Sequence, residues 1–182
     1  MAAGNARRMG FDKAVRRCGR SAPLERVALA LGVRNSILVV APRLRETACR
    51  MMPRSLVLVN EVPQRGMAHS LRVALRFIPR NEAVGVLLGD MPAMNDATIA
   101  RTELLLCDGV DVAFPRNAGG VPGHPVLFAP STRAKLEALP DGDTLRLARD
   151  DPSFVRAEWT CPDASAFLDL DYPAQWEAFA NA

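Results

Sequence analysis

Short apolar runs of strand length alternate along the chain with segments in which apolar residues recur every three or four positions. The runs rich in Val, Ile and Leu predict strands at residues 37–41, 56–59, 84–89, 111–114, 125–129 and 154–159. The helical spacing predicts helices at residues 24–31, 44–52, 70–77, 97–107, 131–139, 144–150 and 173–180. This alternation is typical of an α/β protein whose helices cover both faces of a mostly parallel sheet.

Residues that favour helix and strand ends support these boundaries. Gly32 is suited to end the first helix, and Pro42 stops the strand before it. Ser70 is expected to cap a helix that follows a turn, and Asn95 or Asp96 to cap the helix after the strongest strand. In a doubly wound sheet, ligands bind outside the carboxyl ends of the strands, so polar residues at these ends are candidates for a site.

Composition favours one soluble domain spanning residues 1–182. The net charge of +3 is too small to predict a nucleic-acid partner, and no apolar run is long enough to cross a membrane. The cysteines at positions 18, 49, 107 and 161 have neither zinc-site nor disulfide spacing, which favours reduced thiols and a cytoplasmic protein. The basic first twenty residues leave two other interpretations open, a transit peptide or a solvated face.

The start of the chain has the chemistry of a polyphosphate-binding loop. Ala2, Ala3 and Gly4 are small enough for backbone N–H groups to approach an anion, and Arg8 and Lys13 add positive charge. The segment has neither the Walker pattern nor the dinucleotide-binding G-x-G-x-x-G pattern. It therefore indicates a small phosphorylated ligand of another class.

Two further candidates follow predicted strands. Asp90 follows six uncharged residues at 84–89, and a carboxylate there suits Mg²⁺ together with substrate phosphates, although a turn-forming role before Pro92 is the alternative. Asn60, with Gly66 and Ser70 after it, has groups that would bind a ribose or base. The alternative is that these residues only end the strand and begin the helix, without contacting a ligand.

Two motifs lie in the second half of the chain. Gly123 and His124 belong to a glycine-rich loop that allows close approach to a flat ligand, or forms a hairpin with a structural histidine. Asp169 and Asp171 would point to one face of an extended segment, where one carboxylate would complete a cation site with Asp90. The alternative for Asp171 is a helix cap.

In their order along the chain, these motifs resemble those of the MobA-like nucleotidyltransferase family, most closely its molybdenum cofactor cytidylyltransferase (MocA-type) branch. The resemblance runs from residue 1 to about residue 177. It is carried by Ala2-Ala3-Gly4, Arg8-Met9-Gly10, Lys13, Asn60, Gly66-Met67, Ser70-Leu71, Leu88-Gly89-Asp90-Met91-Pro92, Gly123-His124-Pro125 and Asp169-Leu170-Asp171.

The resemblance implies a single-domain, three-layer α/β/α fold with a mostly parallel, Rossmann-like sheet of the nucleotide-diphospho-sugar transferase type. It implies that Gly4, Arg8 and Lys13 hold a triphosphate, and that Asp90 and Asp171 hold Mg²⁺. The implied reaction transfers CMP from CTP to the phosphate of a molybdopterin-type cofactor and releases pyrophosphate. The implied partners are CTP, the phosphorylated pterin and a molybdoenzyme or its maturation factor.

The chain departs from the family pattern at several positions. Ala6 stands where Ser is usual, the 145–147 segment replaces Gly-Ala-Arg, and Tyr172 and the 174–175 pair alter the usual ending. The apolar strand that usually precedes the first motif is expected to be missing. Two alternatives remain: transfer to another phosphorylated acceptor, such as a sugar or cofactor phosphate, or a non-catalytic molybdenum cofactor binding or delivery protein.

Overall fold

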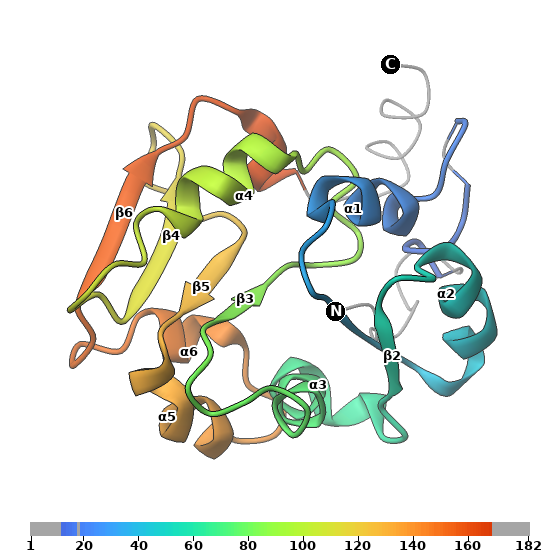
Figure 1. Cartoon of the computed structure of the whole chain (residues 1–182), viewed down its shortest axis with the longest axis horizontal. Coiled ribbons are helices and arrows are strands. Elements are labelled where there is room, and N and C mark those ends of the chain that lie inside the picture. Colours follow the sequence, from blue (N-terminus) through green and yellow to red (C-terminus); the bar gives the residue numbers. More distant parts are fainter. Residues whose placement is uncertain (1–11, 18, 169–182) are drawn as a thin grey trace.

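The computed structural model describes residues 12–17 and 19–168, and strands and helices alternate through them as the sequence predicts (Figure 1). The strands are β1 (Ile37–Val40), β2 (Leu56–Val59), β3 (Val84–Val86), β4 (Val112–Arg116), β5 (Val126–Phe128) and β6 (Arg156–Thr160). The α-helices are α1 (Pro23–Leu31), α2 (Arg45–Met51), α3 (Gly66–Leu75), α4 (Asp96–Glu103), α5 (Arg133–Ala138) and α6 (Leu145–Arg149). Short 3₁₀ turns are η1 (Pro42–Leu44), η2 (Pro63–Arg65), η3 (Pro130–Thr132) and η4 (Ala164–Phe167). The predicted helix at 173–180 lies outside the described residues.

The strands form two groups within the described ranges. β1 and β2 pair in parallel, and the second group has the order β3-β5-β4-β6. β5 is antiparallel to both of its neighbours, whereas β6 is parallel to β4. The α/β class is confirmed, with one antiparallel strand inside the larger group.

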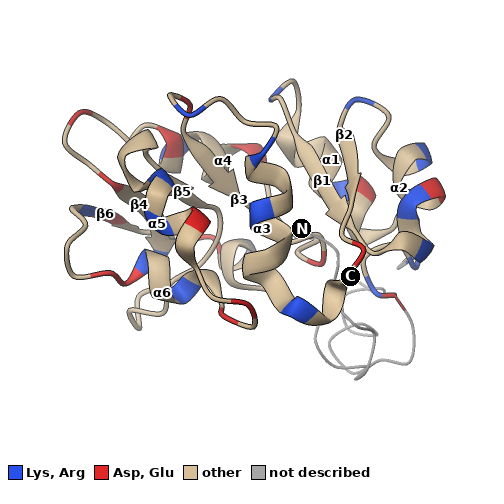
Figure 2. Ribbon diagram, turned by 90° about the horizontal axis from the view of Figure 1, so that it is seen from below, with Lys and Arg blue, Asp and Glu red and all other residues tan. Residues whose placement is uncertain are grey.

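Helix α3 joins the two groups of strands, between which it lies in both ribbon views (Figures 1 and 2). Its buried side chains Leu71 and Leu75 share a hydrophobic core with Val86 of β3 and Phe114 of β4. Helix α1 packs Leu24 into a second core with residues of β1 and α2. Burial of these apolar faces holds the helices on the strands and is the main stabilising contribution.

Several predicted boundaries are wrong, and two of them lie next to candidate site residues. Helix α3 begins at Gly66 rather than at Ser70, because η2 ends directly before it and the helix continues from that turn. Ser70 therefore lies inside the helix, where its hydroxyl donates to the Gly66 carbonyl at 3.3 Å instead of capping the end. The strongest predicted strand ends at Val86, since Leu87 and Leu88 turn to pack on the core around α4.

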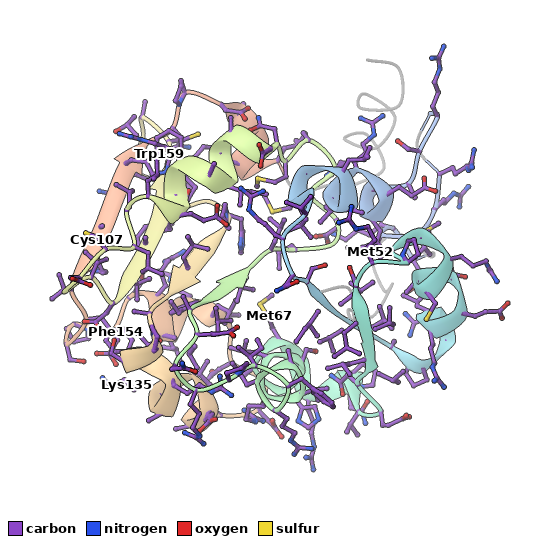
Figure 3. The ribbon with its side chains drawn as sticks, viewed as in Figure 1. Met52, Met67, Cys107, Lys135, Phe154 and Trp159 are labelled. Atoms are coloured by element: carbon purple, nitrogen blue, oxygen red, sulfur yellow. The ribbon has the colours of Figure 1, made fainter. Side chains whose placement is uncertain are left out.

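Other sequence signals are confirmed by the backbone. Asn95 caps α4 by accepting a hydrogen bond from the Thr98 amide at 2.9 Å. Gly32 ends α1 with φ of 58°, a left-handed value that favours glycine, and its amide donates to carbonyls of the last turn. Near α4, the indole of Trp159 donates to the Thr102 hydroxyl at 3.1 Å (Figure 3).

Arg34 links the end of α1 to α4 across the two halves of the molecule. Its guanidinium contacts Asp96 at 2.5 Å and Glu103 at 2.7 Å. We expect Arg34→Met to lower the midpoint of thermal unfolding by about 2–4 °C, since a partly exposed two-carboxylate network contributes on the order of 1 kcal/mol. Differential scanning calorimetry at low and high salt checks this. Arg50→Met, which breaks an exposed pair within α2, is the control and should change little.

Candidate active site

Lys13 and Asp90 meet at the carboxyl edge of the strands. Lys13 Nζ lies 2.6 Å from Asp90 Oδ2, and the two side chains keep 23% and 20% of their surface exposed. Asp90 follows β3, and Lys13 lies in a turn before α1. The neighbouring Asp12 accepts a hydrogen bond of 2.9 Å from Arg43, which follows β1. The first described residues therefore lie where both β1 and β3 end.

Arg43 was not among the candidate residues from the sequence. The signal that identifies its place is Pro42, which ends a buried strand and puts the next side chain at the carboxyl edge. The Asp12 carboxylate holds the pKa of Arg43 above its ordinary value, so the guanidinium stays charged. Arg43 thus adds a second cation at the carboxyl edge, and its partner Asp12 is the residue directly before Lys13.

Asn60 and Ser70 are fully or nearly fully buried and bond to each other. The Asn60 amide donates to the Ser70 hydroxyl at 2.9 Å, and its carbonyl oxygen accepts from the Val62 amide at 2.9 Å. Gly66 has φ of 85° and lies against the backbone of Gly142. These contacts fix the carboxyl end of β2 to α3, and direct contact of Asn60, Gly66 or Ser70 with a ligand stays a prediction.

Gly123 and His124 are held between β3 and η4. The His124 ring donates from Nδ1 to the Val86 carbonyl at 3.2 Å, and its backbone amide donates to Ala166 at 3.0 Å. Gly123 has no space for a side chain, because a Cβ atom would lie 2.5 Å from the Phe167 ring. The loop is therefore anchored beside the strand that leads to Asp90.

Six of the candidate residues lie outside the described part of the chain. They are Ala2, Ala3, Gly4, Arg8, Asp169 and Asp171. Among the described candidates, Lys13 and Asp90 are brought into contact, and His124 is joined to the strand that precedes Asp90. Along the sequence, each of these three residues is more than 30 positions from the next.

The family model described as the MobA-like NTP transferase domain matches residues 1–154, which include Lys13, Asp90 and His124. The chain belongs to the MobA-like NTP transferase family. It is accordingly a nucleotidyltransferase, and Lys13 and Asp90 lie at the sheet edge where an α/β enzyme of this kind binds its ligands. A search of the curated proteins gave no match.

Solved structures of other proteins show the same fold as this NTP transferase domain. Rv0371c from Mycobacterium tuberculosis H37Rv has a TM-score of 0.81 at 24% identity, covering 100% of this chain and 95% of that one. A second Rv0371C structure, with a TM-score of 0.77 at 23% identity, is a complex with manganese and covers 99% of this chain and 95% of that one.

Two further structural neighbours are more distant in sequence. The molybdopterin-guanine dinucleotide biosynthesis protein A of Archaeoglobus fulgidus has a TM-score of 0.65 at 14% identity, covering 99% of this chain and 94% of that one. The 4-diphosphocytidyl-2C-methyl-D-erythritol synthase of Anaerococcus prevotii DSM 20548 has a TM-score of 0.75 at 15% identity, covering 99% and 91%. At these identities the likeness concerns the fold.

The Asp90 carboxylate suits a hard divalent cation that is also bound by substrate phosphates. No group of three or more metal-ligating His, Cys, Asp or Glu side chains occurs among residues 12–17 and 19–168. A cation at Asp90 would therefore take its remaining ligands from substrate, water or residues outside those ranges.

None of the described helices is long and apolar enough to span a membrane.

His124 should make the stability of the NTP transferase domain depend on pH. Burial lowers the pKa of its imidazole below the ordinary value of 6.5. The hydrogen bond to Val86 acts in the opposite direction, but the effect of burial is larger. The unfolded chain then binds more protons than the folded one, so stability is fully present above pH 6.5 and falls as the pH drops through that value.

This prediction is checked by thermal unfolding between pH 7.5 and pH 5. We expect His124→Asn, which keeps a hydrogen-bond donor near Val86, to reduce the loss of stability toward acid. His69→Gln removes the only other histidine and serves as the control, retaining the wild-type pH dependence. An unchanged pH profile in His124→Asn would assign the effect to other groups.

Proposed function

We propose that this nucleotidyltransferase transfers CMP from CTP to the terminal phosphate of a molybdopterin-type cofactor. An oxygen of that phosphate attacks the α-phosphorus of CTP, the bond between the α-phosphorus and the bridging oxygen breaks, and pyrophosphate leaves. The observation that carries the proposal is the contact of Lys13 with Asp90 at the carboxyl edge, since it combines a cation for phosphate with a carboxylate for a metal.

The triphosphate side is assigned to the start of the chain. Lys13 would hold the β- and γ-phosphates and stabilise the charge that develops on departing pyrophosphate, together with Arg8. The small residues Ala2, Ala3 and Gly4 would let backbone amides approach the same phosphates. No nucleophilic side chain is needed, because the acceptor phosphate itself attacks.

Mg²⁺ is the proposed cofactor, with Asp90 and Asp171 as its protein ligands. When bound, it would neutralise charge on the phosphates and polarise the α-phosphate for attack. The Asp90 carboxylate would bind such a cation in place of Lys13, and the Lys13 ammonium would then turn to the phosphates. The manganese in the Rv0371C structure supports a divalent cation for a protein of this fold.

The acceptor is assigned to the loop between β4 and β5. Asn117 closes this loop with two hydrogen bonds to Val121. Its side-chain oxygen accepts from the Val121 backbone amide at 2.9 Å, and its backbone amide donates to the Val121 carbonyl at 2.9 Å. Val121 is 55% exposed, and Gly123 and His124 anchor the end of the loop beside β3. An exposed apolar residue on a fixed loop suits stacking against a flat pterin ring.

The nucleotide preference and the acceptor are tested in two steps. Thermal shifts with Mg²⁺ and CTP, GTP, UTP or ATP should show the largest stabilisation with CTP. Pyrophosphate release from CTP should then require Mg²⁺ and a molybdopterin-type acceptor. Release with a sugar phosphate instead would reassign the acceptor. Tight binding of the dinucleotide product, in which CMP is joined to the cofactor phosphate, without any pyrophosphate release from CTP would indicate a delivery protein.

Such a transferase would work in the cytoplasm and pass its product to a molybdoenzyme or its maturation factor. Co-purification of the protein with a molybdoenzyme, dependent on addition of the dinucleotide product, tests this part. Binding that is equally strong without the product would contradict a role in handing it over.

A further inference from the structure

Asp12 and Arg43 form an ion pair directly beside Lys13, and the proposed reaction gives neither of them a role. Arg43 Nε donates to Asp12 Oδ2 at 2.9 Å, and Arg43 Nη2 contacts the other carboxylate oxygen, Oδ1. Such a two-point contact fixes the orientation of the two groups as well as the distance between them. The Asp12 side chain, at 22% exposed, is as enclosed as that of Lys13.

Arg43 extends from a rigid part of the backbone. It lies in η1, directly after β1, and it follows Pro42, whose ring fixes its own φ angle. The flanking Ala41 and Leu44 are buried, and the Leu44 amide donates to the Ala41 carbonyl at 2.9 Å. Arg43 is therefore a fixed anchor at the carboxyl end of β1.

The backbone that carries Asp12 is closed into a turn. The Asp12 carbonyl accepts from the amides of Val15 and Arg16, each at 3.2 Å. The Ala14 carbonyl accepts from the amide of the fully buried Leu24 at 2.9 Å, which fixes the turn to the start of α1. Because the turn is short and hydrogen-bonded at both places, the position of the Asp12 side chain limits where the backbone of the next residue can lie.

Neighbouring residues of this turn reach the ends of two different strands. Asp12 is held by Arg43 after β1, whereas Lys13 lies 2.6 Å from Asp90 after β3. The lysine ammonium is at the end of a flexible four-carbon stem, and fixing such a stem costs side-chain entropy. Part of that freedom is removed in advance when the backbone at the base of the stem is anchored. The contact of Asp12 with Arg43 supplies this anchor on the β1 side of the turn.

The anchor matters most when Asp90 is occupied. In the proposed reaction the Asp90 carboxylate binds a divalent cation and Lys13 turns to the phosphates, so their mutual contact no longer holds the lysine in place. The contact of Asp12 with Arg43 involves neither of these groups and can stay unchanged in that state. A displacement of about 1 Å at a group that acts on the reacting atoms can cost about 10²-fold in rate, so such an anchor has a large effect to protect.

We propose that the pair of Asp12 and Arg43 positions the Lys13 ammonium at the carboxyl edge, where it meets the phosphates of the nucleotide. Asp12 and Arg43 are then positioning residues, which act through Lys13 and need not touch the substrate. This inference rests on the proposed function only in giving Lys13 the phosphates as its target. The placement of Lys13 itself can be measured without any nucleotide or acceptor.

The first measurement is the acetylation rate of Lys13 in the whole protein at low acetic anhydride concentration, followed by mass spectrometry. Lys13 and Lys135 are the two lysines of the chain, so Lys135 is an internal reference. We expect Arg43→Met and Asp12→Asn to raise the acetylation rate of Lys13 about threefold or more, because the ammonium then leaves Asp90 more often. The rate at Lys135 should not change.

The second measurement is a double-mutant cycle on pyrophosphate release. Arg43→Met should lower turnover about tenfold, whereas in a Lys13→Met background the same substitution should cost less than about twofold. Arg43→Lys keeps the positive charge without the two-point contact, and should recover part of the rate. The unfolding midpoint, recorded for each variant, separates loss of position from loss of the fold.

Arg50→Met is the matched control, because Arg50 also pairs with a carboxylate, that of Glu46, in the neighbouring helix α2. It should change neither the labelling of Lys13 nor turnover. Unchanged labelling of Lys13, or unchanged turnover, in both Arg43→Met and Asp12→Asn would overturn the proposal. An equally large loss from Arg43→Met in the Lys13→Met background would also overturn it, because Arg43 would then act on the substrate directly. Faster labelling of Lys13 in a protein whose wild type releases pyrophosphate from no nucleotide would contradict the proposed function alone.

Discussion

Asp90→Asn should lower nucleotidyl transfer by about 10³-fold or more while leaving the fold intact. Asparagine keeps the shape of the side chain but loses the charge that would hold a divalent cation, and such a cation contributes several kcal/mol to stabilising the charge on a transferring phosphoryl group. The measurement is pyrophosphate release from CTP over a range of Mg²⁺ concentrations, with the unfolding midpoint recorded for the same samples.

The control for this variant is Asp108→Asn, an exposed carboxylate in the turn before β4. It should release pyrophosphate at the wild-type rate. Loss of the Lys13–Asp90 contact itself should cost little stability, since partly exposed ion pairs contribute about 1 kcal/mol or less. A near wild-type rate for Asp90→Asn would remove Asp90 from the metal site.

Lys13→Met should lower turnover by about 10²-fold or more, because it removes a cation directed at charge that develops on pyrophosphate. The methionine keeps most of the aliphatic stem, so packing in the turn is preserved. Lys13→Arg keeps the charge but not the geometry, and should recover part of the rate. The readout is kcat and KM for CTP at saturating acceptor.

The chain provides its own control, since Lys135 is its only other lysine. Lys135 lies in α5, where it pairs with Asp151 at 2.5 Å and lies 4.8 Å above the Phe154 ring (Figure 3). Lys135→Met should leave turnover unchanged. If Lys13 and Asp90 act together, the double variant should lose far less than the product of the two single losses.

Much of the fold could be predicted from apolar periodicity and turn residues. The four-residue strand β1 and the capped helix α4 follow from local signals, because a buried run and an Asn cap act over a few residues. The start of α3 could not be predicted, since it depends on η2 and on contact between Gly66 and Gly142, which is distant in sequence.

The candidate site was predicted in part. The order of motifs brought Lys13 and Asp90 to one edge because strands in such sheets end together. The internal bonding of Asn60 with Ser70 could not be foreseen, because it depends on how closely α3 packs on the end of β2. The contact of Arg43 with Asp12 could not be foreseen either, because it depends on how the segment around Asp12 packs against the end of β1.

Strand β6, at one end of the four-stranded group β3-β5-β4-β6, carries charged side chains. Strand β6 presents the exposed Arg156, and its Glu158 is paired with Arg116 at 2.7 Å. Charged residues on an edge strand oppose addition of strands from other molecules. The strand at the outer end of the four-stranded sheet thus disfavours edge-to-edge pairing, which would otherwise promote aggregation.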